Sequence, residues 1–205
     1  MNKTLLCTLL AVTAGAAQAA GPSSAAWSLL GDVTNVAGTL TLTTAYSDEL
    51  PGNLSGSPAA FIDDIETMAA LPAYALDVGD EPAYEGSLIG QSFDVQPGDV
   101  ITLRWQFSTD ETLFQDQAFV VINGQLITLA TRGGAPVGEQ VFSHHFNFAG
   151  TTSIYFGVVD TGDFIGVSTL KVSDLQFAPV PEPATWALWL GGAGLLGAWR
   201  RRTRP

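Results

Sequence analysis

The sequence predicts an all-β fold, an antiparallel β-sandwich of jelly-roll or lectin-like type with one short surface helix. The main observation is that apolar and polar side chains alternate in many segments of strand length. A second observation is Asn123-Gly124 between two apolar segments, a strong signal for a tight hairpin. About seven to nine strands without a long helix are typical of a two-sheet sandwich.

The segment DVITLRWQF (99–107) shows the alternation most clearly. Its apolar residues fall on one face, so we expect Trp105 to point into the core between Leu103 and Phe107. The other expected strands are 39–46, 86–95, 141–148, 153–159, 167–177 and the two arms of the hairpin in 117–130. Residues 20–178 are long enough for one domain with its own core.

The segment SPAAFIDDIETMAAL (57–71) predicts the helix. Ser57 is the expected N-cap, Pro58 the expected first helical residue, and Pro72 ends the element. One apolar stripe, formed by Phe61, Ile65 and Met68, is expected to cover part of a sheet.

The charge of the body limits its partners. Residues 20–180 contain nineteen acidic and three basic residues, a formal charge of −16. Such a surface repels nucleic acid and anionic lipid. Divalent cations and neutral glycans are the partners compatible with this charge. The alternative explanation is that the charge only keeps the protein soluble, because like-charged molecules repel each other.

The N-terminus predicts export. Lys3 precedes the apolar run LLCTLLAVTAGA, and the small residues AQA (17–19) follow it, as in a signal peptide handled by the Sec machinery. We expect cleavage after Ala19. Because Cys7 is the only cysteine, the exported protein would contain no disulfide.

The C-terminus predicts a single transmembrane helix. Prolines near residue 181 end the last strand, and residues 184–199 carry no charge. As a helix they span roughly 24 Å, somewhat less than the roughly 30 Å hydrocarbon core. The cluster Arg200, Arg201, Arg202 and Arg204 would hold its end in the cytoplasm and leave the body outside.

Pro181-Glu182-Pro183, the apolar segment and the cluster Arg200 to Arg202 together resemble the PEP-CTERM sorting signal of Gram-negative bacteria, over 179–205. This resemblance implies an inner-membrane-anchored precursor, processing by an exosortase, and delivery to the cell surface or the exopolysaccharide matrix. Within residues 84–177, WQFSTD and VVDTGD resemble one group of PEP-CTERM ectodomains. That group implies no catalytic activity.

Acidic residues at the ends of two expected strands are candidate calcium ligands. They are Asp110, Glu111, Asp116, Asp160 and Asp163. Calcium prefers six to eight oxygen ligands, and loops at one edge of a sandwich can supply them. The alternative is that these side chains are solvated loop acids. Apart from calcium, no cofactor is expected.

The sequence contains no pattern that names a reaction. His144 and His145 alternate on one strand, so they cannot share a metal, and we expect one to face solvent and the other to pack. No G-x-S-x-G turn is present. We therefore expect a non-enzymatic surface or matrix protein with a structural or adhesive role and weak glycan binding. The alternative is an extracellular glycoside hydrolase or lyase with two carboxyl groups brought together by the fold.

Overall fold

The computed structural model describes residues 27–131 and 136–178. The expected signal peptide (1–19) and the expected C-terminal segment (179–205), with its transmembrane helix at 184–199, lie outside this part of the chain. Among the described residues, no helix is both long and apolar enough to cross a membrane.

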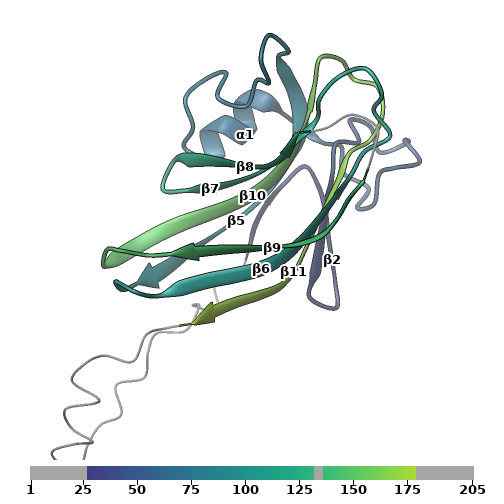
Figure 1. Ribbon diagram of the computed structural model, residues 1–205. Coiled ribbons are helices and arrows are strands. Elements are labelled where there is room, and N and C mark those ends of the chain that lie inside the picture. The colour runs from purple at the N-terminus through teal and green to yellow at the C-terminus, as the bar shows by residue number, and fades with distance from the viewer. Residues whose placement is uncertain (1–26, 132–135, 179–205) are drawn as a thin grey trace, which may run out of the picture. The chain divides into compact units, whose positions relative to one another are not determined.

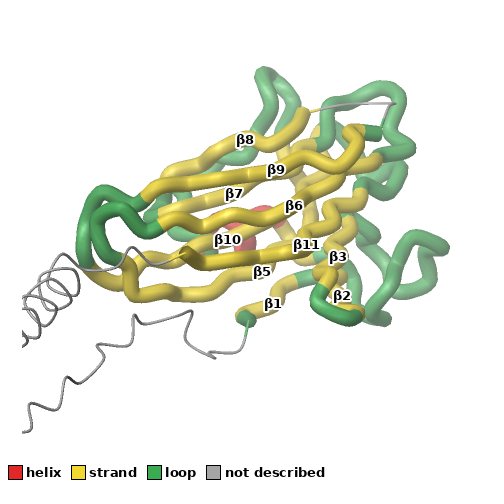
Figure 2. Tube along the Cα trace, turned by 60° about the horizontal axis from the view of Figure 1, so that its bottom comes forward, coloured by secondary structure: helices red, strands yellow, loops and turns green. Residues whose placement is uncertain are grey.

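The described residues form two antiparallel sheets (Figures 1 and 2). The first, sheet A, has the order β1 (Ser28–Leu30), β5 (Ala83–Val95), β10 (Gly150–Thr161), β7 (Gln117–Ile122), β8 (Gln125–Thr131), with β4 (Ala60–Phe61) paired to β5. The second, sheet B, has the order β2 (Asp32–Val36), β3 (Thr39–Thr43), β11 (Thr169–Ala178), β6 (Val100–Ser108), β9 (Val137–His145).

This strand order confirms the predicted fold. The orders β3-β11-β6-β9 and β5-β10-β7-β8 are those of the two four-stranded sheets of a jelly roll. The predicted hairpin joins β7 to β8, with φ of 52° at Asn123 and 71° at Gly124. Two residues with positive φ form the type I′ turn, whose twist matches that of the strands that it joins.

The main core lies between the two sheets. It contains Trp105 and Phe107 of β6 in sheet B together with Ile89 of β5 and Phe156 of β10 in sheet A. Trp105 is 7% exposed, so the prediction that it points inward is confirmed. Apolar and polar residues alternate along β6 because every second side chain enters the core, as the sequence predicts.

A second cluster lies on the outer face of sheet A. Helix α1 (Ile62–Met68) and the chain after it cover this face, and Ile65 and Leu76 pack there against Leu88 and Phe119 of the sheet. Figure 1 shows α1 on the side of sheet A away from sheet B. Because both faces of β5 are covered, this strand is buried nearly throughout rather than alternating.

The predicted start of the helix was wrong. The helix begins at Ile62 after Phe61, and no side chain caps it, so Ser57 and Pro58 lie outside it. The reason is that Ala60 and Phe61 pair with Gly86 and Glu85 of β5, which holds this segment extended. Phe61 consequently lies on the surface, whereas Ile65 is buried as expected.

Candidate functional site

Three segments that connect strands meet at one end of the sandwich, which we call the loop-bearing end. Residues 44–82 join β3 to β5 and contain β4 and α1, residues 109–116 join β6 to β7, and residues 162–168 join β10 to β11. The strand register places them together, because Ser108 at the end of β6 lies opposite Thr169 at the start of β11. Gln117 at the start of β7 lies opposite Val159 near the end of β10. The ends of the two strands that carry the predicted calcium ligands therefore lie at the same edge.

Three of the five predicted ligands hold the loops themselves. Asp110 accepts a hydrogen bond from the amide of Val167, and Asp163 from that of Ile165. Glu111 is buried, and its Oε1 accepts the amides of residues 112, 113 and 114. These side chains fix the 109–116 and 162–168 connections, a role for which short acidic side chains in loops are well suited.

The other two predicted ligands, Asp116 and Asp160, are fully buried between the sheets. Asp116 accepts hydrogen bonds from Ser168 Oγ, Thr109 Oγ1 and the amide of Thr161. These hydrogen bonds join the residue before β7 to the end of β10 and to the residues that adjoin β6 and β11. Asp160 has no hydrogen-bond partner on either carboxyl oxygen.

The structure adds Glu85, which the sequence analysis did not single out. Glu85 is 2% exposed, lies directly opposite Asp160 in the β5–β10 register, and also lacks a hydrogen-bond partner on both oxygens. Alternation along β5 places it on the same face as Ile89 of the main core. The sequence could have identified Glu85 by its spacing. It lies an even number of residues before Ile89, a core position of the same strand, so its side chain points to the same side.

Burial and mutual repulsion perturb these carboxyl groups. Burial, with the charges of Asp116 and Asp163, raises the pKa of Glu85 to about 8. Burial also raises the pKa of Asp160 far above its usual range, and the charges of Asp116 and Glu85 add to this effect. The pKa of Asp116 is raised by burial, while its hydrogen bonds to Ser168 and Thr161 oppose the rise. Both carboxyl groups of the Glu85–Asp160 pair therefore hold their protons to a higher pH than an exposed carboxyl group does.

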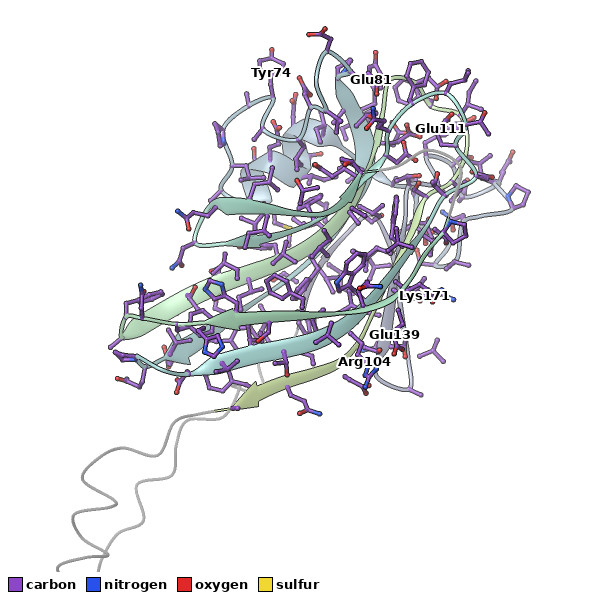
Figure 3. All side chains as sticks on the ribbon, viewed as in Figure 1. Tyr74, Glu81, Arg104, Glu111, Glu139 and Lys171 are labelled. Atoms are coloured by element: carbon purple, nitrogen blue, oxygen red, sulfur yellow. The ribbon has the colours of Figure 1, made fainter. Side chains whose placement is uncertain are left out.

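No basic side chain among the described residues offsets this cluster. Arg104 lies on the outer face of sheet B, where it pairs with Glu139 and Asp174. Lys171 is exposed, and Figure 3 shows it apart from Glu111 at the loop-bearing end. In their present conformations, no three histidine, cysteine or acidic side chains of the described chain are grouped as a ready-made metal site.

The two histidines behave as expected. His145 is exposed, whereas His144 is half-buried and contacts Phe146 edge-to-face, with 5.0 Å between ring centroids. Burial lowers the pKa of His144. His144 thus packs against the protein, and His145 faces solvent.

An aromatic patch, formed by Tyr46, Tyr84 and Phe164, lies at the loop-bearing end. The ring of Phe164 is 4.7 Å from that of Tyr84 and 6.2 Å from that of Tyr46, measured between centroids. Tyr46 is 47% exposed and Phe164 43% exposed, although both are large aromatic residues. Three chain segments contribute one ring each, and Asp163 precedes Phe164 in the sequence. Aromatic faces with a few polar groups nearby are typical of ligand sites.

Comparison with known proteins identifies the C-terminal segment. Residues 179–202 match the model of the PEP-CTERM protein-sorting motif. The resemblance predicted from the sequence is thus confirmed, and the motif indicates an exported, exosortase-processed protein of Gram-negative bacteria. Among curated proteins, no match to the chain is found.

The solved structures to which this chain is similar include several carbohydrate-binding modules. A structure titled "CBM4 structure and function" is 14% identical, with a TM-score of 0.35, over 74% of this chain and 92% of that one. The N-terminal cellulose-binding domain of Cellulomonas fimi β-1,4-glucanase C is 12% identical, with a TM-score of 0.36, over 76% and 90%. TmCBM61, solved with β-1,4-galactotriose, is 10% identical, with a TM-score of 0.34, over 75% and 88%. These likenesses are too distant to indicate a ligand for this chain.

Proposed function

We propose that this protein is exported, released from its C-terminal signal by an exosortase, and retained at the cell surface or in the exopolysaccharide matrix. There its sandwich acts as a non-catalytic structural or adhesive module that binds neutral polysaccharide. The PEP-CTERM motif supports the destination. The aromatic patch at the loop-bearing end is the observation that supports the binding.

The chemistry of the patch suits a sugar ring. The face of an aromatic ring carries partial negative charge, which attracts the C–H bonds on the apolar face of a pyranose. Tyr46 and Tyr84 add phenolic hydroxyls that can exchange hydrogen bonds with sugar hydroxyls. A body charge of −16 disfavours anionic polymers, so an uncharged polysaccharide is the better electrostatic match.

The carboxyl groups at the loop-bearing end do not favour the alternative function, a glycoside hydrolase. Such an enzyme needs two carboxyl groups that flank the bond to be cut, one of them with a raised pKa. Glu85 and Asp160 have raised pKa values, but both are buried between the sheets, where a polysaccharide cannot reach them. Their position therefore argues for a role in the fold rather than in hydrolysis.

We expect Phe164→Ala and Tyr46→Ala each to weaken polysaccharide binding by roughly tenfold, the usual effect of losing an aromatic contact of about 1–2 kcal/mol. Binding is measured by retention of the full chain, purified in mild detergent, on a panel of neutral polysaccharides. Tyr74→Ala is the matched control, because Tyr74 is 80% exposed and lies outside the patch. Equal retention of all three variants and the unaltered protein would contradict the assignment.

The proposal also predicts the mass of the mature protein. Since both ends are processing signals, the product recovered from the cell surface should lack residues 1–19 and everything beyond about Pro183. Intact-mass spectrometry of the native product measures this directly. A surface protein that still ends in the arginine cluster would contradict exosortase processing.

A further inference from the structure

We propose that Glu85, Asp116 and Asp160 bind one divalent cation, with calcium as the best candidate, between the two sheets at the loop-bearing end. This site differs from a calcium site in the surface loops, since it is made by side chains of β5, β10 and the residue before β7. Cation binding at this site does not depend on polysaccharide binding.

Two other buried carboxyl groups show how this protein satisfies such groups. Asp32 accepts hydrogen bonds from Thr43 Oγ1 and from the amides of residues 54 and 55. Glu66 accepts the amides of Tyr74 and Leu76. A buried carboxyl group without partners is costly, so folded proteins rarely keep one.

Glu85 and Asp160 break this pattern together. All four of their carboxyl oxygens are buried without a hydrogen-bond partner, and the two residues face each other across the β5–β10 pair. In this conformation protonation does not satisfy them, because each carboxylic acid has a donor and an acceptor and none of the four oxygens has a partner. A bound cation would satisfy both groups at once.

The donor set indicates the class of cation. The cluster offers only carboxylate oxygens, with no histidine or cysteine, and hard divalent cations prefer such ligands. Asp116 adds a third carboxylate next to the pair: its charge raises the pKa of both Glu85 and Asp160, and its hydrogen bond from Thr161 places it beside the end of β10. A carboxylate that already accepts hydrogen bonds keeps lone pairs for a metal.

The three carboxyl groups do not converge on a point in this conformation. Binding would therefore require the three side chains to turn toward one position, where each acts as a deprotonated ligand.

The site would also order the neighbouring loops. Asp116 is tied to Ser168 of the 162–168 connection, the segment that carries Phe164 of the aromatic patch. Millimolar calcium outside the cell is sufficient for extracellular modules of modest affinity.

The test is thermal unfolding of the full chain in mild detergent, with calcium chloride, with sodium chloride of matched ionic strength, and with chelator. We expect calcium at a hundredfold excess over its Kd to raise Tm by about 5 °C or more above the sodium control. Titration calorimetry at pH 7 should show calcium binding at a single site.

Glu85→Gln and Asp160→Asn should each abolish the calcium shift, while their Tm in chelator stays at or above that of the unaltered protein. That second readout separates loss of binding from failure to fold. Asp94→Asn is the matched control: Asp94 is exposed at the opposite end of β5, and this variant should keep the full shift. Equal Tm in calcium and sodium, or a shift that survives Glu85→Gln, would overturn the proposal.

Discussion

Replacing Trp105 with alanine is expected to lower the free energy of unfolding by about 3–5 kcal/mol, the usual range for a large buried aromatic residue. Trp105 lies on β6, an inner strand of sheet B, and its side chain packs in the main core between the sheets. The substitution removes a large apolar area from the core and leaves a cavity that β-strands paired on both sides cannot close.

Chemical denaturation measures this effect, with Gln106→Ala as the control. Gln106 is the next residue on β6 and is exposed on the opposite face, so its replacement should change stability by no more than about 0.5 kcal/mol. A Trp105→Ala variant as stable as Gln106→Ala would contradict the placement of this strand.

The second large effect is a loss of stability as the pH rises. The pKa of Glu85 is raised to about 8 in the folded protein, so between about pH 4.5 and pH 8 the folded state binds more protons than the unfolded state. The free energy of unfolding must therefore fall with increasing pH across this window, by up to about 1.4 kcal/mol per pH unit for each proton. Asp160 acts in the same direction, and the charges of Asp116, Asp163 and Glu111 face this pair.

Glu85→Gln isolates this contribution. In chelator, the variant and the unaltered protein should have the same free energy of unfolding near pH 4, where Glu85 is neutral like the glutamine that replaces it. At pH 8 the variant should be the more stable of the two. Asp94→Asn, which removes an exposed carboxyl group from the same strand, should leave the slope unchanged. The free energy of unfolding is measured by chemical denaturation at several pH values from 4 to 9. If it changes with pH in the same way for Glu85→Gln and for the unaltered protein, the buried position of Glu85 is contradicted.

The regular strands could be predicted from the sequence because one of their faces is buried. β6 and the β7–β8 hairpin carry their own signals, an alternating pattern and an Asn-Gly turn. β1, β2 and β4 were missed because they are short or lie at sheet edges, where few positions are buried. The start of the helix was misplaced because pairing of Phe61 with β5 overrode a local capping signal.

The candidate site was predicted only in part, for a physical reason. Sequence position shows that Asp160 and Asp163 follow one another closely, but not that one points between the sheets while the other accepts a loop amide. Glu85 lies 75 positions before Asp160 in the numbering, and only the β5–β10 register brings the two together. The aromatic patch likewise combines rings from three separate segments.

We propose the loop-bearing end of the sandwich as its binding surface. Amide chemical-shift mapping of the isotope-labelled full chain in detergent, titrated with a soluble fragment of the polysaccharide that it retains, tests this claim most directly. We expect shifts concentrated at Tyr46, Tyr84 and residues 162–168, with the amide signals of Gln106 and Lys171 on sheet B unchanged. Shifts centred on the outer face of sheet B, or no shifts at all, would contradict it.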